Sequence, residues 1–298
     1  MKKIIACVPN FSEGRDIEKI DSIASAVSNI PGVELLDRHV DPDHNRAVLT
    51  FAGEIAQVSE AAFQAVKKAT EIMTLENHSG EHPRIGVADV VPFVPVLNST
   101  LEECAEAARE VGKRIGNELN LPVYLYGSVA ANPSRENLAN IRKGQYESIR
   151  AEIEHNPERK PDFGPSKISS AGAVAVGTRR PLIAFNINLD TSDVSIAKKI
   201  AEKIRESSGG LKSVRALGLF LKSKGIAQVS MNLTNFRETG ITQVFEAVES
   251  EADALGVSVK NSELIGLAPR AAFEGIDTER IKLENFTDAQ ILEKRLGL

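Results

Sequence analysis

The order of short apolar runs and turn signals constrains this fold most, because the same order occurs twice along the chain. Strands are predicted where runs of β-branched and aromatic residues are bounded by turn residues. In the first half these runs lie at residues 4–8, 33–39, 45–51 and 87–96. In the second half they lie at residues 182–189, 214–221, 226–233 and 257–265.

Helices are predicted between these runs, where apolar residues recur at helical spacing. In the first half they run from a cap at Ser12 or Asp16 to about residue 30, and over residues 54–75. In the second half they run from Ser192 or Asp193 to residue 207, and over residues 242–255. Each half therefore predicts a β-α-β-β-α-β unit, the ferredoxin-like pattern of an α/β (α+β) fold, with its helices on one sheet face. The 298 residues suit two domains, which we place at residues 1–178 and 179–298.

The first half carries additional segments after its fourth strand. A helix is predicted at residues 101–119, a short strand at 123–126, and a helix at 134–153 with a break near Gly144. Residues 155–170 contain three prolines, several charges and little periodicity, so composition alone indicates a linker.

Period-two alternation in the second half separates an apolar strand face from an amide-rich one. Asn186 and Asn188 share one face of their strand, and Asn232 shares a face with Gln228 and Ser230 on another. These faces carry few charges, so we expect the open sheet faces of the two halves to face each other across a polar cleft. A plain solvent-exposed face remains the alternative.

Composition excludes several classes of protein. No apolar run approaches the roughly 18 residues of a membrane span, and the apolar start ends at Pro9, too short for a signal peptide. Cys7 and Cys104 are the only cysteines, which fits a reducing cytoplasm. The net charge of −5 disfavours non-specific nucleic-acid binding, and an anionic ligand would need a local basic patch.

Residues 77–95 hold the strongest candidate for catalysis. Gly80 and Pro83 argue against a helix, so His82 is expected in a stiff loop before a strand, where an imidazole can exchange protons near neutral pH. His78 and His82 have the spacing of a zinc-binding helix, but the breakers between and after them spoil that geometry. We therefore expect no metal.

Six short passages spread over the chain carry a family resemblance. They are CVPNFSEG at 7–14, HPRIG at 82–86, DVVPFVP at 89–95, PVYLYG at 122–127, PDFGP at 161–165 and LIAFNINL at 182–189. Their wording and order resemble the formiminotransferase family of histidine degradation and one-carbon metabolism. The resemblance implies transfer of a formimidoyl group from N-formimidoyl-L-glutamate to N5 of tetrahydrofolate, a co-substrate.

The resemblance also implies roles for individual residues. The histidine of the family's His-Pro-Arg motif is the general acid/base, and that position is His82. The family's Asp-Phe-Gly-Pro segment lines the folate site, which implicates Gly172 and four consecutive residues, Asp162, Phe163, Gly164 and Pro165.

The first predicted hairpin adds further candidates for binding substrate, His39, Asn45 and Arg46. We expect Leu35, Asp37 and His39 to share a strand face. Some family members carry Asp at the position of His39, so its role stays open. Arg46 and Arg84 could grip carboxylates with their planar guanidinium groups, since both substrates carry glutamate. Ordinary solvated arginines remain the alternative.

Other functions remain open from the sequence. Formyl transfer from N-formylglutamate would need the same acid/base, a folate-binding paralogue would lack turnover, and a zinc hydrolase would need metal. Nucleotide cofactors are not expected, because the chain lacks a glycine-rich phosphate motif. We expect a homodimer without nucleic-acid or membrane partners, whose product passes to a separate cyclodeaminase.

Overall fold

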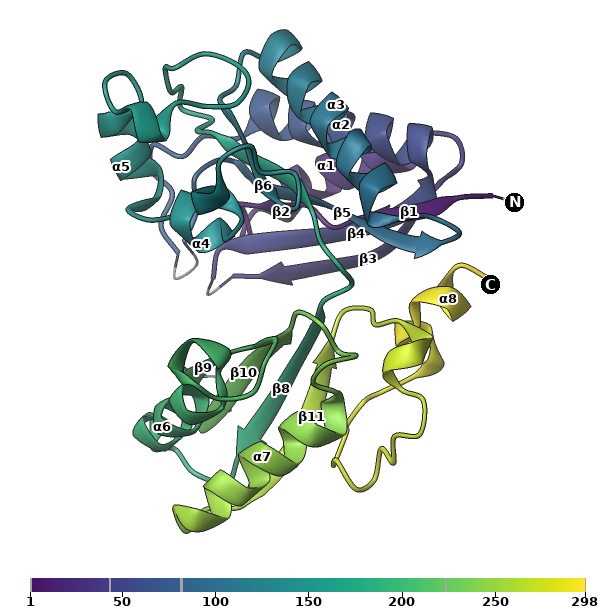
Figure 1. The fold of residues 1–298 in the computed structure, drawn as a ribbon, viewed down its shortest axis with the longest axis vertical. Coiled ribbons are helices and arrows are strands. Elements are labelled where there is room, and N and C mark those ends of the chain that lie inside the picture. The colour runs from purple at the N-terminus through teal and green to yellow at the C-terminus, as the bar shows by residue number, and fades with distance from the viewer. Residues whose placement is uncertain (1, 43, 81–82, 223, 298) are drawn as a thin grey trace. The chain divides into compact units, whose positions relative to one another are not determined.

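The computed structural model describes residues 2–42, 44–80, 83–222 and 224–297. The chain forms two compact units, Met1–Arg179 and Arg180–Leu298 (Figure 1). Both units contain the β-α-β-β-α-β order, which confirms the predicted fold class. The cleft that we expect between the two halves stays a prediction.

The first unit begins with the predicted elements and then continues with additional ones. Its first part contains β1 (Ile4–Cys7), β2 (Asn10–Phe11), α1 (Ile17–Ser28), β3 (Val33–Asp41), β4 (Arg46–Glu54), α2 (Ile55–Ile72) and β5 (Ala88–Leu97). The continuation contains α3 (Leu101–Glu118), β6 (Val123–Gly127), α4 (Leu138–Ile141), α5 (Gln145–Glu152) and β7 (Val174–Thr178).

These strands form one seven-stranded sheet. β3 pairs with β4, and β4 pairs with both β1 and β2, which in turn pair with β5; all these pairs are antiparallel. The sheet then continues through β7 to β6 in parallel pairs. The unit is therefore a ferredoxin-like sheet extended by two parallel strands.

β7 is absent from the sequence-based expectation. All its residues are buried, and its sequence VAVGT is short and rich in small side chains. A strand buried on both faces shows no alternation, so periodicity does not reveal it. The helix expected at residues 134–153 has its predicted break at Gly144, which is left-handed at φ 73° between α4 and α5. It is also interrupted earlier, because its first residues form a separate 3-10 turn before α4.

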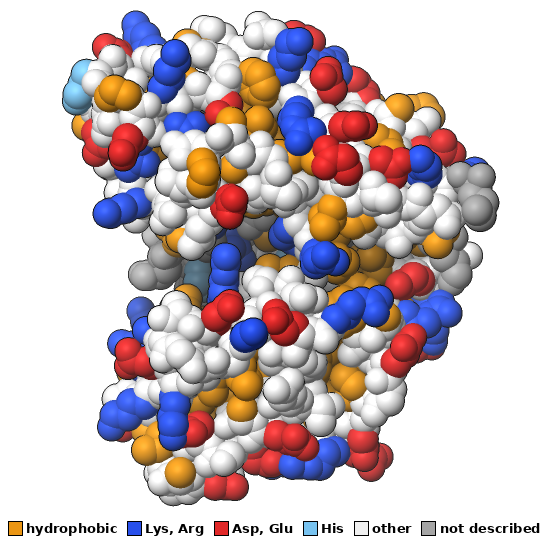
Figure 2. Space-filling view, in the orientation of Figure 1, with side chains coloured by type: hydrophobic (Ala, Val, Ile, Leu, Met, Phe, Trp, Pro, Cys, Tyr) orange, Lys and Arg blue, Asp and Glu red, His pale blue; other side chains and the backbone are white. Residues whose placement is uncertain are grey.

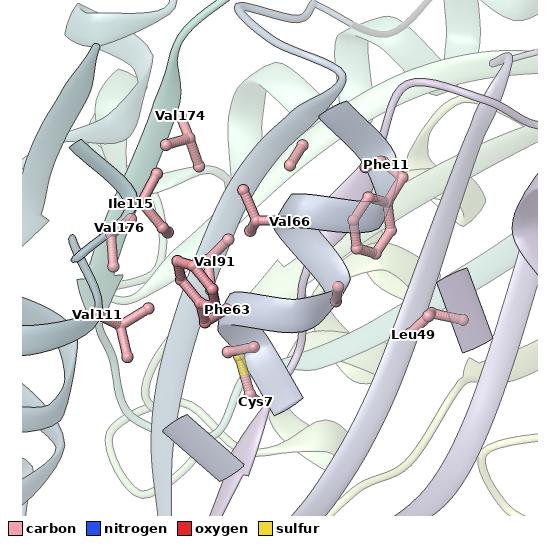
Figure 3. Close-up of a cluster of buried hydrophobic side chains, with 14 of the residues drawn as sticks. Cys7, Phe11, Leu49, Phe63, Val66, Val91, Val111, Ile115, Val174 and Val176 are labelled. Carbon is pink, nitrogen blue, oxygen red and sulfur yellow. The ribbon is translucent and has the colours of Figure 1, made fainter. Parts of the chain in front are cut away.

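α1, α2 and α3 cover one face of this sheet and enclose its main core. Figure 3 shows Phe63 and Val66 of α2 and Ile115 of α3 against side chains of the strands. α4 and α5 pack on the opposite face instead, where their isoleucines contact Tyr124 and Tyr126 of β6. The expectation that all helices lie on one face is therefore wrong for this unit, since the added strands β6 and β7 need cover on both faces.

A bulge in β3 changes which side chains share a face. Leu35 pairs with Phe51 of β4, but Asp37 pairs with Thr50, so Leu36 is the extra residue between them. One extra residue shifts the period-two alternation to the other face. Leu35 consequently packs against the main core, and the prediction that it shares a face with Asp37 and His39 is wrong.

The second unit matches the predicted elements closely. It contains β8 (Ile183–Leu189), α6 (Val194–Ile204), β9 (Val214–Leu221), β10 (Ile226–Leu233), α7 (Ile241–Ala254), β11 (Val259–Ile265) and the short α8 (Leu292–Arg295). The sheet is antiparallel with the strand order β11-β8-β10-β9. The apolar face predicted for β8 is fully buried in a core with α6 and α7.

Charged side chains of both signs are interspersed on the surface drawn in Figure 2, without one broad patch of a single sign. Within the described residues, no helix is both long and apolar enough to cross a membrane. In the same part of the chain, no three His, Cys, Asp or Glu side chains gather as metal ligands. Because the surface drawn in Figure 2 has no broad positive patch, we expect an anion to be recognised by a few neighbouring basic side chains.

Two glycines on the inner face of α3 test how tightly this unit is packed. A Cβ on Gly116 would lie 2.6 Å from the backbone nitrogen of Gly164 and 2.8 Å from Cβ of Phe163, whereas a Cβ on Gly112 would meet only side-chain atoms, at 3.3 Å or more. Alanine favours a helix by about 1 kcal/mol over glycine. Overpacking typically costs about 1–3 kcal/mol.

We therefore expect Gly116→Ala to lower the free energy of unfolding by about 1–2 kcal/mol, although its helix propensity improves. Gly112→Ala is the matched control and should change it by less than about 1 kcal/mol. Urea unfolding followed by circular dichroism measures both. Equal stability of the two variants would contradict the described packing of residues 163–164 on α3.

Candidate active site

Three chain segments meet at Asn45, in the turn between β3 and β4. Asn45 adopts a left-handed conformation (φ 49°) and is 7% exposed. Its side-chain oxygen accepts a hydrogen bond from the backbone nitrogen of Gly14 at 2.9 Å, and its side-chain nitrogen donates to the carbonyl of Ser79 at 3.0 Å. Asn45, a predicted binding residue, thus ties the segment after β2 and the segment after α2 to this turn.

The segments approach too closely for side chains at two positions. A Cβ on Gly14 would lie 2.2 Å from the carbonyl oxygen of Asp41, and one on Gly80 would lie 2.4 Å from that of His44. Backbone oxygens cannot move aside as a flexible side chain could. The contact between these segments therefore requires glycine at both positions.

His78 links Asn45 to Arg84. Its Nε2 lies 3.1 Å from the carbonyl oxygen of Asn45 and therefore carries the proton, because a carbonyl only accepts. Its Nδ1 accepts a hydrogen bond from Nε of Arg84 at 3.3 Å. The pKa of His78 is lowered, chiefly by burial and further by the charge of Arg84. His78 is thus held in its neutral form with one defined tautomer.

Four of the five N–H donors of Arg84 have acceptors in the protein. Nη1 and Nη2 donate to the two carboxylate oxygens of Glu147 at 2.8 and 2.6 Å, and Nη1 also donates to Gln145 at 3.0 Å. The hydrogen bonds from Arg84 hold the pKa of Glu147 below its usual range. The fork that we expected to grip a substrate carboxylate therefore binds a carboxylate of α5.

These contacts hold both ends of the segment that carries the predicted catalytic residue. Ser79 is bound by Asn45 on one side, and Arg84 is bound by Glu147 on the other. His82 itself lies outside the described residues, so its predicted role as general acid/base stays a prediction.

His39 and Arg46 lie on the sheet face opposite α1–α3. His39 is half-buried and pairs with Val48, and Arg46 lies two residues before Val48 on β4, so the three side chains share this face. Nε of Arg46 is buried, and no described residue accepts a hydrogen bond from it. Nε of Arg84 binds His78, whereas Nε of Arg46 has no acceptor among the described residues.

The segment Asp162 to Pro165 holds β6 against α3. Asp162 accepts hydrogen bonds from the backbone of Leu125 at 2.7 Å and from Arg135 at 3.0 Å. Phe163 packs on the main core, Gly164 is left-handed at φ 80°, and Pro165 is half-buried. The side chains of Asp162 and Phe163 are thus engaged within the protein.

Gly172 lies beside the end of the His82 segment. It forms an isolated antiparallel bridge with Gly86, and a Cβ on Gly172 would come within 2.3 Å of the carbonyl oxygen of Ile85. The structure therefore brings Gly172 next to the segment that also carries Arg84.

The predicted amide residues of the second unit form a network on their own sheet. Asn188 donates to Asn261 at 2.6 Å and accepts from Gln228 at 2.9 Å, while Asn186 donates to Glu263 at 3.3 Å. Asn232 is exposed. The amide-rich face is confirmed, and its part in binding a ligand stays a prediction.

Neither cysteine provides a nucleophile. Cys7 and Cys104 are both buried and not joined in a disulfide. Burial raises the pKa of Cys104 to about 12 and that of Cys7 well above its usual value. Both thiols therefore stay protonated at neutral pH, so the chemistry of this unit does not begin from a thiolate.

Sequence reasoning missed two charged residues of this region, Asp89 and Arg142. Asp89 is 2% exposed and accepts a hydrogen bond from the backbone nitrogen of Ile85 at 2.8 Å, and its other oxygen pairs with Arg142. A lone aspartate inside the apolar run of β5 was a usable signal, because buried carboxylates need partners. Arg142 carried no such signal in a segment expected to be an ordinary helix.

Comparison with known proteins gives a consistent result for both units. The family model described as "Formiminotransferase domain, N-terminal subdomain" matches residues 4–179, and that described as "Formiminotransferase domain" matches residues 184–291. A protein of Streptococcus pyogenes serotype M1 named glutamate formimidoyltransferase is 46% identical over 298 residues, covering 99% of each chain. One of the same name from Thermoplasma acidophilum is 45% identical over 98% of this chain and 97% of its own.

A longer relative also matches the whole chain. The formimidoyltransferase-cyclodeaminase of Mus musculus is 42% identical over 311 residues, which span 100% of this chain and 57% of the mouse protein. The similarity thus covers only part of that relative.

The environment of His78 predicts a specific pH dependence of stability. Its folded pKa lies below the ordinary value of 6.5, so as the pH falls below about 6.5 the unfolded chain binds this proton first. His78 therefore contributes stability that is present above pH 6.5 and lost as the pH falls toward its folded pKa.

We expect His78→Gln, which keeps a donor for Asn45 and does not titrate, to lose less unfolding free energy between pH 7.5 and 5.5 than the wild type. His155→Gln replaces an exposed histidine of the same unit and is the matched control. Urea denaturation at the two pH values measures the difference. The same pH dependence in wild type and His78→Gln would refute the neutral state assigned to His78.

Proposed function

The chain belongs to the formiminotransferase family, as its sequence motifs predicted, and we propose that it is a glutamate formimidoyltransferase. One observation carries this proposal: two proteins of that name are 45% and 46% identical to it over nearly the full length of both chains. The proposed reaction moves the formimidoyl group of N-formimidoyl-L-glutamate to N5 of tetrahydrofolate and releases L-glutamate.

The reaction requires one proton to leave and another to arrive. The N5 amine attacks the formimidoyl carbon and must lose a proton as the tetrahedral adduct forms. The nitrogen of the departing glutamate must gain a proton as its bond to that carbon breaks. We propose that His82 serves both steps, first as base and then as acid, because an imidazole titrates near neutral pH.

The contacts around His82 in the sequence support this proposal. Catalytic groups must be held in a fixed geometry, and loops do this only when their ends are anchored to rigid elements. Asn45 holds Ser79 on one side, while Glu147 of α5 holds Arg84 on the other. Accordingly, we assign Asn45 and Arg84 to positioning this loop rather than to direct contact with substrate.

The remaining candidates divide into residues whose side chains we propose to contact substrate and residues that we propose to contribute through their backbone. His39 and Arg46 are proposed to contact substrate, since they share a sheet face and Nε of Arg46 has no acceptor in the part of the chain that the structure describes. For Asp162 and Phe163 the proposed contribution to the folate site is through the backbone, because their side chains are engaged. Backbone contacts are proposed for Gly164, Pro165 and Gly172 as well.

The fate of the product and the setting of the reaction belong to the same proposal. The mouse relative is named formimidoyltransferase-cyclodeaminase, so we infer that a cyclodeaminase activity consumes the formimidoyl-folate product. A reducing compartment such as the cytoplasm is proposed because both cysteines are free thiols. We further propose a homodimer.

Replacing the proposed acid/base tests the mechanism. His82→Ala should lower the rate of formimidoyl transfer about 10²–10⁴-fold, the usual share of general acid/base catalysis. Binding of tetrahydrofolate, measured by calorimetry, should stay within a few-fold, and circular dichroism should show an unchanged fold. A variant with near-native turnover would remove His82 from the mechanism.

The choice of donor tests the function itself. We expect transfer from N-formimidoyl-L-glutamate to be faster than from N-formyl-L-glutamate, with tetrahydrofolate as acceptor in both assays. Spectrophotometric detection of the substituted folate measures both rates on the same enzyme preparation. Faster formyl transfer would reassign the enzyme to the oxygen analogue, and no transfer from either donor would leave a folate-binding protein without turnover.

A further inference from the structure

The arginines of the first unit differ in how far the protein satisfies them. Arg84, Arg135 and Arg159 each donate to several protein oxygens, among them the carboxylates of Glu147, Asp162 and Glu152. Nε of Arg46 and Nε of Arg142 are buried, and neither has a hydrogen-bond partner among the described residues. An unsatisfied buried donor is costly, which indicates that these two arginines await an acceptor.

Arg46 and Arg142 lie on the same face of the sheet, and Asp89 is bound to Arg142. Arg142 follows α4, which packs on the sheet face that also carries Arg46, and it pairs with Asp89 of β5. Asn10 of β2 pairs with Val48 of β4 and with Val90 of β5, so Arg46 and Asp89 lie close to the same row of the sheet. Burial lowers the pKa of Arg46 most and the positive charge of Arg142 lowers it further, while Asp41 and Asp89 raise it. Two carboxylates lie near these cations: Asp89, which is bound to Arg142, and Asp41, whose charge raises the pKa of Arg46 more than that of Asp89 does.

We propose that Arg46 and Arg142 together bind a carboxylate of the glutamate moiety of the formimidoyl donor, with Asp89 positioning Arg142. This inference rests on the proposed function for the identity of the ligand. A carboxylate would supply acceptors for the unsatisfied donors and would offset the repulsion between the two guanidinium groups. The net charge of the chain is −5, so such a local pair is the kind of site that an acidic substrate requires.

The position of Asp89 favours the donor's glutamate over the glutamate of folate. The same carboxylate that pairs with Arg142 accepts a hydrogen bond from the backbone of Ile85. Ile85 follows His82 by three residues, a chain length that spans at most about 11 Å. In the donor, the α-carboxyl carbon is three bonds from the formimidoyl carbon, whereas in tetrahydrofolate the whole p-aminobenzoyl group separates N5 from the glutamate.

Direct binding measurements on the full chain test this site without relying on turnover. N-formyl-L-glutamate, in the absence of folate, is the probe for the donor, and 5-formyltetrahydrofolate is the probe for the folate. The variants are Arg142→Gln, Arg46→Gln and Arg142→Lys. Arg109→Gln is the matched control, because Arg109 is a partly exposed arginine on α3, the helix that covers the opposite sheet face.

We expect Arg142→Gln and Arg46→Gln each to weaken binding of N-formyl-L-glutamate about 10- to 100-fold, the usual loss for a charge-assisted hydrogen bond. Binding of 5-formyltetrahydrofolate should change less than about threefold, below the effect of one such bond. Arg142→Lys should fall between Arg142→Gln and wild type, because it keeps the charge but not the fork. Arg109→Gln should bind both probes as the wild type does.

The outcomes separate this inference from the proposed function. Unchanged binding of N-formyl-L-glutamate by both glutamine variants would overturn it, and so would a loss confined to 5-formyltetrahydrofolate, which would assign the pair to the folate tail. If the wild type binds N-formyl-L-glutamate through both arginines but transfers nothing, the carboxylate site stands and the proposed function fails. Should Arg142→Gln misfold because Asp89 is left unpaired, Arg46→Gln, which leaves the Asp89 pair intact, decides the result.

Discussion

The side-chain amide of Asn45 holds three segments of the first unit together: the turn between β3 and β4, the residues that follow β2 and the residues that follow α2. Two hydrogen bonds of Asn45, which is in a left-handed conformation, join these segments, and Nε of Arg15 adds a bond from the segment after β2 to the carbonyl of Pro42 in the turn. Gly14 and Gly80 permit the close approach on either side. From Asn45 the hydrogen bonds continue through His78 to Arg84 and on to Glu147, so these side chains connect the turn between β3 and β4 to α5.

The buried arginines of this unit fall into two groups, according to whether the protein supplies acceptors for their N–H donors. Arg84 and Arg135 donate to carboxylates in other segments of the chain and so connect these segments. Arg142 pairs with Asp89, and the buried Nε atoms of Arg46 and Arg142 have no acceptor among the described residues. Because arginine keeps its proton at physiological pH, a buried guanidinium nitrogen needs an acceptor, and that is the role we propose for the carboxylate of the donor. Whether an arginine here connects segments or is available to a ligand therefore depends on the acceptors around it, not on its being an arginine.

The sequence predicts the second unit well, because the alternation from Ile183 to Leu189 directly reports one buried face. It predicts the first unit less well for two physical reasons. Val174 to Thr178 is buried on both faces and shows no alternation, and the bulge at Leu36 reverses the faces by a single residue without a mark in composition. The candidate site is limited in another way: Arg84 and Arg46 look alike in sequence, and only the pairing of Arg84 with Glu147, 63 residues later, tells them apart.

The place of β7 in the sheet has a consequence for biosynthesis. β7 is the last strand of its unit to leave the ribosome, yet it lies between β5 and β6, which were made earlier. Until residue 178 has emerged, the nascent chain carries β5 with an open edge and β6 without its strand partner. Such edges are templates for association with other chains. Closure of this sheet is therefore a late, single event in the life of the nascent polypeptide, and it coincides with the first residues of the second unit leaving the exit tunnel.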